Sequence, residues 1–196
     1  MEIHFENKKI EKMNTLILLA GCGLGDGSCI EETVLTYLAL DRYQCTYQAV
    51  AVDMPTTSVN HISEEDAEER NVLVESARIG RGTIQALDCV QLDDFDCLII
   101  PGGIGLMRNY ADVPAVQELI FSFLDQKKPI ATMCAGIDFL RRFLGRDLLQ
   151  EAYETLSPDS FCREQGIYYT PAFRKTRSLC DVQKGIDAMI EALTFA

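Results

Sequence analysis

The sequence predicts an α/β fold with a mainly parallel central sheet, and three observations support this prediction. Short, wholly apolar runs such as residues 98–100 and 130–133 stop abruptly before a glycine corner or a cysteine, as strands buried on both faces of a parallel sheet do. Segments with apolar residues at helical spacing alternate with these runs. Repeated strand–helix units place helices on both faces of the sheet. We therefore expect ligands to bind beyond the carboxyl ends of the strands.

The first half of the chain alternates strands and helices around glycine-rich or polar turns. Residues 15–20 are almost entirely apolar and predict a buried strand, and residues 47–52 predict a second one. Between them, Val34, Leu35 and Leu38 recur at helical spacing. The other elements expected here are the glycine-rich turn 21–28, the helix 30–43, and a helix over 65–79 that follows Ser63 and Asp66, which resemble a capping box.

The second half of the chain repeats the alternation. Pro114 indicates where one helix begins, because proline is favoured in a first helical turn. The remaining strands are short apolar runs, and the remaining helices carry apolar residues on one face. In chain order, we expect strand 97–101, helix 114–125 with Val116, Leu119, Ile120 and Phe123 on one face, strand 130–133, a helix with Ile137, Leu140 and Leu144, strand 167–170, and helix 179–193.

Length and composition favour a single globular domain over residues 1–196. The chain is 47% hydrophobic and 24% charged, which allows a sizeable core. Residues 1–13 are polar and mixed in charge, and we expect them to form a flexible tail or a leading strand. The net charge of −12 argues against nucleic acids and anionic membranes as partners, because their phosphates would be repelled. No apolar run approaches the roughly 18 residues that span a bilayer.

The cysteines predict reduced thiols in a cytoplasmic protein. The beginning of the chain has no apolar stretch of the signal-peptide type, and disulfides belong mostly to secreted proteins. No CxxC pair occurs, and His4 and His61 are the only histidines, so no metal site is expected. The glycine-rich turn lacks the GxGxxG pattern and has Asp26 where a pyrophosphate would lie. We therefore expect no cofactor.

Cys134 is the predicted chemical centre of the protein. It ends the apolar strand 130–133 and is followed by the small residues Ala135 and Gly136 and by a helical pattern. A thiol on such a strand-to-helix turn has the geometry of a nucleophile elbow, where helical N–H groups favour a thiolate. Glu31 and Glu32, in the first turn of an earlier helix, have two interpretations. They complement the helix dipole, or one of them reaches Cys134 as an acid and base.

A set of short motifs that spans nearly the whole chain carries a family resemblance: residues 21–28, Glu32 with 34–36, 59–61, 70–82, 101–103 and Asn109, 133–134, 170–173 and 185–187. With these motifs the sequence resembles the ThiJ/PfpI superfamily, which has the class I glutamine amidotransferase-like fold. Within it, the sequence is similar to the ElbB-like branch, named for enhancing lycopene biosynthesis. The resemblance implies a flavodoxin-like three-layer sandwich with a nucleophile elbow.

The resemblance also assigns roles to individual residues. It implies Cys134 as the elbow cysteine, Glu32 as its partner, and the backbone N–H groups of Gly103 and Ala135 as oxyanion donors. Ala135 stands where protease-like members have a histidine, so a Cys–His hydrolase or amidase would lack its base. Further candidates for the pocket are Gly23, Asp26, His61 and Asn109; His61 either lines the pocket mouth or hydrogen-bonds within its loop.

The resemblance implies a cofactor-independent glyoxalase that converts small 2-oxoaldehydes to hydroxyacids. Cys134 would form a hemithioacetal with the aldehyde, and Glu32 would move a proton between its two carbons. One alternative is a redox or stress-response protein with an oxidisable Cys134. Another is a non-catalytic member that binds a small molecule or a partner protein. The expected partner is a small-molecule aldehyde, and the resemblance also allows for a homodimer.

Overall fold

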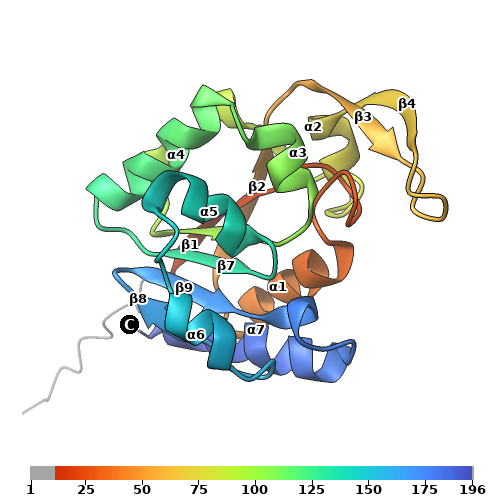
Figure 1. The fold of residues 1–196 in the computed structure, drawn as a ribbon. Helices are drawn as coiled ribbons and strands as arrows, with labels where there is room; N and C mark the ends of the chain where they lie inside the picture. The colour runs from red at the N-terminus through yellow and green to blue at the C-terminus, as the bar shows by residue number, and fades with distance from the viewer. Residues whose placement is uncertain (1–11, 196) are drawn as a thin grey trace, which may run out of the picture.

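The computed structural model describes residues 12–195 and is built around one seven-stranded sheet (Figure 1). Every neighbouring pair of strands is parallel except the last, which confirms the predicted mainly parallel α/β fold. The predicted tail over residues 1–13 lies outside the described residues, apart from its last two positions. In spatial order the strands are β5 (Gln85–Ala86), β2 (Thr46–Ala51), β1 (Asn14–Leu18), β6 (Cys97–Ile100), β7 (Ile130–Met133), β9 (Ile167–Thr170) and the antiparallel β8 (Cys162–Glu164).

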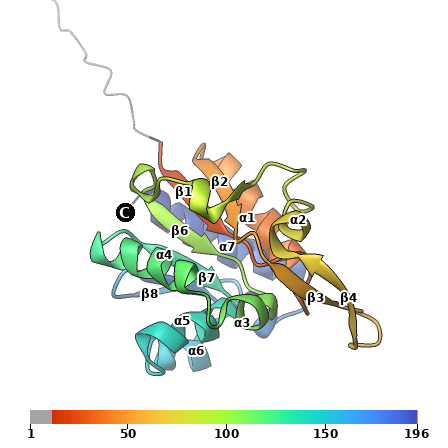
Figure 2. The ribbon, with the colours of Figure 1, turned by 90° about the horizontal axis from the view of Figure 1, so that it is seen from above.

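Helices cover both faces of the sheet and give three layers, as Figures 1 and 2 show together. Two helices pack side by side on one face, and most of the others cover the opposite face. Within residues 12–195, no helix has the length and apolar character that crossing a bilayer requires. The first face carries α1 (Ile30–Arg42) and α7 (Leu179–Thr194), and the second carries α3 (Gly105–Tyr110), α4 (Pro114–Asp125), α5 (Gly136–Leu144) and the short α6 (Gln150–Thr155).

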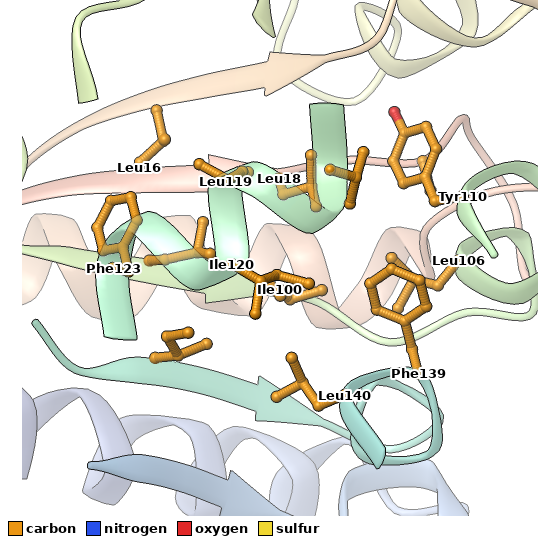
Figure 3. Packing of buried hydrophobic residues seen from close by; sticks show 14 of the residues in the cluster. Leu16, Leu18, Ile100, Leu106, Tyr110, Leu119, Ile120, Phe123, Phe139 and Leu140 are labelled. Carbon is orange, nitrogen blue, oxygen red and sulfur yellow. The ribbon is translucent and has the colours of Figure 1, made fainter. Parts of the chain in front are cut away.

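The core consists of two apolar clusters, one against each face of the sheet. Leu16 and Leu18 of β1 belong to the cluster beneath α4, whereas Ile17 between them belongs to the cluster beneath α1 and α7. Figure 3 shows Ile120 and Phe123 of α4 packed in the first cluster. Burial of each such side chain contributes about 1.5–3 kcal/mol, so the two clusters hold the three layers together.

The strand order places a topological switch point between β1 and β6. The chain leaves β1 for β2 on one side and later returns through β6 to build the other side. In sheets of this kind, ligands bind at the carboxyl ends of the strands beside the switch point. The glycine-rich turn follows β1 and the Pro101–Gly103 corner follows β6, so both predicted corners meet at this position.

The helix predicted over residues 65–79 is wrong. β4 (Asp66–Asn71) pairs antiparallel with β3 (Pro55–Val59), and only α2 (Val72–Ser76) is helical. The sequence of β4, DAEERN, has no apolar face that could hold a helix against the core, and its pairing with β3 satisfies the backbone instead. Ser63 lies in the hairpin turn, and it is Asn71 that caps α2.

Candidate functional site

Cys134 sits on a tight turn between β7 and α5. Its φ angle of +49° lies in the left-handed region, which few residues other than glycine adopt. Its N–H donates a hydrogen bond to the carbonyl of Thr170 at 3.2 Å, which ties the turn to the neighbouring strand β9. The turn therefore has the strained geometry typical of a nucleophile elbow.

The elbow depends on Gly136, where α5 begins directly against the sheet. A Cβ atom at this position would lie 1.9 Å from Oγ1 of Thr132, closer than any real contact. The Thr132 hydroxyl donates to the carbonyl of Ile100 at 2.8 Å, so it cannot move aside without losing that hydrogen bond. The absence of a side chain at Gly136 therefore permits the helix to start at this point.

Replacing Gly136 with alanine is expected to destabilise the protein by about 2–4 kcal/mol, because the new methyl group overpacks the elbow and displaces the Thr132 hydroxyl. Urea unfolding would measure the loss. Gly80→Ala is the matched control, since its new Cβ would meet ordinary contacts at 3.4 Å. Adding Thr132→Ala to Gly136→Ala should restore part of the lost stability. Equal unfolding midpoints for Gly136→Ala and Gly80→Ala would contradict this interpretation.

Glu32 lies beside Cys134, in the first turn of α1. Its side chain is fully buried, with 0% exposure, and its Oε2 accepts a hydrogen bond from the N–H of Gly102 at 2.9 Å. A Cβ atom at Gly102 would lie 2.5 Å from Oε2 of Glu32 and 2.8 Å from Cβ of Cys134. The carboxyl group and the cysteine thus flank the same glycine, and the carboxyl group does not point to solvent as a simple dipole partner would.

Burial makes the Glu32 carboxyl group an unusually weak acid. Removal from water raises the pKa of its carboxyl group to about 7, although the Cys134 thiol and the N–H groups of Gly102 and Phe173 act in the opposite direction. The thiol and the Phe173 N–H approach the carboxyl group, but Oε1 receives no well-directed hydrogen bond from any described residue. A carboxyl group with a pKa near 7 can both give and accept a proton at neutral pH.

The thiol of Cys134 differs from the sequence-based expectation of a favoured thiolate. Burial, followed by the charge of the Glu32 carboxylate, raises the pKa of this thiol to about 12. The N–H of Ala135 and the guanidinium group of Arg174 lower it. The sequence indicated the helical N–H groups behind the sulfur, but not how deeply the sulfur and its acidic partner are buried. Cys134 therefore rests as a protonated thiol.

The predicted oxyanion donors lie at the ends of β6 and β7. Gly103 has a φ angle of +125°, and a Cβ atom there would lie 2.2 Å from the carbonyl oxygen of Gly27, so this corner packs backbone against backbone. Within residues 12–195, the N–H of Gly103 donates no hydrogen bond. The N–H of Ala135 is directed at the sulfur of Cys134. The N–H of Gly103 is therefore unengaged among the described residues, and that of Ala135 lies beside the thiol.

The structure groups His61, Asp26 and Gly23 in a second place. His61 and Asp26 line a cavity of about 460 Å³ between the glycine-rich turn and the β3–β4 hairpin. Nε2 of His61 accepts a hydrogen bond from the N–H of Gly25 at 3.1 Å, so the ring carries its proton on Nδ1, which lies 3.0 Å from the carbonyl oxygen of Val59. A Cβ atom at Gly23 would lie 2.6 Å from Nε2. His61 therefore packs on this turn.

Asn109 joins α3 to the glycine-rich turn. Its amide N–H groups donate to the carbonyls of Ala20 at 2.7 Å and Asp26 at 2.9 Å. Its Oδ1 accepts a hydrogen bond from the Thr56 hydroxyl at 2.7 Å. Because both ends of this largely buried amide are engaged, Asn109 holds the wall of the site and offers no free donor to a ligand.

Sequence reasoning missed two residues that reach the Cys134–Glu32 pair. The N–H of Phe173 approaches the Glu32 carboxyl group, and the Arg174 guanidinium group acts on Cys134. Both follow β9, the strand that neighbours β7. The signal was present, because the segment after a strand adjacent to the elbow strand must emerge at the same edge of the sheet.

Curated relatives match part of the chain. The "ES1 protein homolog, mitochondrial" of Rattus norvegicus is 34% identical over 131 residues, which cover 60% of this chain and 49% of that protein. The "Glutamine amidotransferase-like class 1 domain-containing protein 3, mitochondrial" of Homo sapiens is 33% identical over 131 residues, with the same coverage of 60% and 49%. The match thus spans about half the length of these relatives.

The relatives contradict the predicted cytoplasmic location, because they are mitochondrial proteins. That prediction depended on unpaired cysteines and on the absence of an apolar stretch near the beginning of the chain. Neither observation separates the cytoplasm from an organelle. The eight cysteines are free thiols in the structure.

Comparison with solved structures and with a family model identifies the fold and the family of the chain. An "isoprenoid biosynthesis protein with amidotransferase-like domain" from Ehrlichia chaffeensis is 30% identical, with a TM-score of 0.83 and coverage of 92% of this chain and 97% of that one. DJ-1beta of Drosophila melanogaster shares the fold at 13% identity, with a TM-score of 0.60 and coverage of 94% and 92%. The DJ-1/PfpI family model matches residues 24–144, more than half of the sequence. The chain belongs to the DJ-1/PfpI family.

Proposed function

We propose that the protein is a cofactor-independent glyoxalase that converts small 2-oxoaldehydes, such as glyoxal, to hydroxyacids. The observation that carries this proposal is the buried Glu32 carboxyl group, which has a pKa raised to about 7 and lies beside Cys134 at the elbow. Membership of the DJ-1/PfpI family supports a DJ-1-like role in general terms. The likeness to the Ehrlichia chaffeensis isoprenoid biosynthesis protein supports a place in the ElbB-like branch.

The first step joins the thiol to the aldehyde. The sulfur of Cys134 forms a bond to the aldehyde carbon, and the thiol proton passes through Glu32 to the aldehyde oxygen, which gives a hemithioacetal. Because the pKa of the thiol is raised, the proton leaves as the sulfur attacks rather than beforehand. The N–H groups of Gly103 and Ala135 stabilise the negative charge that develops on the oxygen.

The second step moves hydrogen between two neighbouring carbons. The Glu32 carboxylate removes the proton from the hemithioacetal carbon and returns it to the adjacent carbonyl carbon, while the hydroxyl proton passes from the first oxygen to the second. The first carbon is thereby oxidised to a thioester and the second reduced to an alcohol, so no external oxidant is needed. Water then cleaves the bond between sulfur and carbon, its hydrogen restores the Cys134 thiol, and the hydroxyacid leaves.

Incubation with glyoxal in deuterated water would test this function. The expected product is glycolate, formed without glutathione or added metal, and NMR should find deuterium on its alcohol carbon. The label is expected because the proton held by Glu32 exchanges with solvent before it returns. Glycolate without deuterium would show that the transferred hydrogen does not exchange with solvent, as in a direct hydride transfer or a shuttle shielded from water. No glycolate at all would refute the function.

The state of the thiol favours this function over the redox alternative. Oxidation-sensing cysteines are exposed and have a low pKa. Cys134 is only partly exposed, and burial raises the pKa of its thiol. A proton-sharing mechanism needs no free thiolate at rest, because Glu32 takes the proton during attack.

A further inference from the structure

The turn that follows β9 carries a positive charge to the reacting thiol. Thr170, at the end of this strand, accepts the hydrogen bond of the Cys134 N–H, and the 3₁₀ turn Ala172–Arg174 begins two residues later. The Arg174 guanidinium group acts electrostatically on the Cys134 sulfur. The mechanism above uses the thiol, the carboxyl group and the backbone donors, but it leaves this cation without a role.

Arg174 is held in place by two contacts. Its Nη2 donates to Asp138, in the first turn of α5, and the guanidinium group lies 4.8 Å from the centroid of the Tyr153 ring. The side chain is 27% exposed, and among the described side chains of residues 12–150 and 152–195 its other N–H groups donate no hydrogen bond. A guanidinium group has five N–H donors, so Arg174 keeps donors for a ligand while its position is set.

The surrounding cluster keeps a net positive charge. Asp138 also pairs with Arg141 at 3.7 Å, so one carboxylate serves two guanidinium groups. Arg141 packs on the same ring, 4.5 Å from the centroid of Tyr153. In a protein with a net charge of −12, this positive patch next to the elbow is an exception that favours an anionic ligand.

A buried hydroxyl group beside the cluster also lacks a partner. Tyr169 of β9 is fully buried, with 0% exposure, and its hydroxyl makes no hydrogen bond within residues 12–195. Cys134 and Asp138 are among the groups that act electrostatically on this hydroxyl. Buried polar groups are nearly always paired in proteins. An unpaired hydroxyl in this position therefore points to a polar ligand held between the thiol and the Asp138–Arg174 pair.

We infer that the cluster of Asp138, Tyr153, Tyr169 and Arg174 selects 2-oxoaldehydes that carry a carboxylate group. The guanidinium group of Arg174 binds the carboxylate through charge-assisted hydrogen bonds, and the aldehyde then lies against Cys134. Asp138 and Tyr153 act through Arg174 as positioning residues. This inference rests on the proposed function, because it names the substrate class of the same site.

Two aldehydes that differ in charge test the inference. Methylglyoxal and 4,5-dioxopentanoate share the 2-oxoaldehyde, and only the second carries a carboxylate. The wild-type protein should favour 4,5-dioxopentanoate in kcat/KM, and Arg174→Gln should lower that preference by about tenfold, mainly through KM. Arg174→Lys keeps the positive charge but lacks the paired N–H donors of a guanidinium group. This variant should therefore retain part of the preference for 4,5-dioxopentanoate. The matched control is Arg42→Gln, whose side chain pairs with Asp187 on the opposite face of the sheet; it should keep the full preference.

A second test needs no turnover and separates this inference from the proposed function. Iodoacetate and iodoacetamide both alkylate thiols with loss of iodide and differ in charge, so the ratio of their rates at Cys134, followed by peptide mapping, reports the nearby cation. Arg174→Gln should lower the iodoacetate-to-iodoacetamide ratio about tenfold, and Arg42→Gln should leave it unchanged. A ratio that depends on Arg174 without aldehyde turnover would refute the glyoxalase and support the anion site. An unchanged ratio in folded Arg174→Gln and Arg174→Lys variants would overturn the inference.

Discussion

Replacement of Cys134 by serine is expected to lower kcat/KM for glyoxal by about a thousandfold or more. The hydroxyl group retains the shape of the elbow, but it is a far weaker nucleophile than sulfur and does not form a comparable covalent intermediate. Cys134→Ala removes the nucleophile altogether and should abolish glycolate formation. Product formation over time, measured by NMR at glyoxal concentrations well below KM, gives the comparison directly.

Two other thiols provide controls for this prediction. Cys22 is partly exposed and lines the second cavity beside His61, and Cys180 is exposed at the start of α7. Cys22→Ser and Cys180→Ser should both retain the wild-type rate, because neither thiol lies beside Glu32. Full activity in Cys134→Ala, or its loss in Cys22→Ser, would mean that the chemistry takes place at a different thiol.

The replacement of Glu32 by glutamine is expected to remove both turnover and a marked pH dependence of stability. In the folded protein the pKa of this carboxyl group is about 7, compared with an ordinary value of 4.5. The neutral form is thus favoured by folding, so its stabilising contribution is complete below pH 4.5 and is lost as the pH rises through 7. The loss approaches about 3 kcal/mol, since each pKa unit corresponds to roughly 1.4 kcal/mol. Glutamine does not ionise and should escape this loss.

Urea unfolding between pH 5 and 9 would measure the effect. Glu32→Gln should match the wild type near pH 5 and exceed its stability by up to about 3 kcal/mol at pH 9. At the same time, its turnover of glyoxal should fall by about 10²–10⁴, the usual contribution of a general acid and base. Glu31→Gln is the matched control, because Glu31 is the exposed neighbour in the same helical turn. A Glu32→Gln variant as pH-sensitive as the wild type would show that Glu32 ionises freely in the fold.

The sequence predicted those elements whose signal is local. The helix at Pro114–Asp125 and the strands Ile130–Met133 and Ile167–Thr170 have the predicted bounds, because an initiating proline and short apolar runs suffice to define them. The elements that were missed, β5, β8, α3 and α6, have two to six residues each and depend on contacts with distant segments. The β3–β4 hairpin was missed because its charged sequence has no period that indicates a strand.

The candidate site shows the same division. Cys134 could be found from the sequence because an apolar strand, a cysteine and two small residues follow one another. The acidity of Glu32 could not, because it depends on how deeply α1 begins beneath the corner that follows β6. Arg174 was missed because its partner Asp138 lies 36 positions earlier in the chain. The resemblance suggested His61 for the pocket of Cys134, whereas the hairpin carries it to a cavity that Cys134 does not line.

Gly102 has a consequence for the redesign of this protein. A side chain at this position would collide with the Glu32 carboxyl group and with Cys134 at the same time, so only main-chain atoms of Gly102 fit between the two side chains. Mutagenesis libraries aimed at new substrates should therefore leave Gly102 unchanged and vary the turn that carries Arg174. Variants selected in this way would exchange substrates while the proton-transfer geometry stays the same.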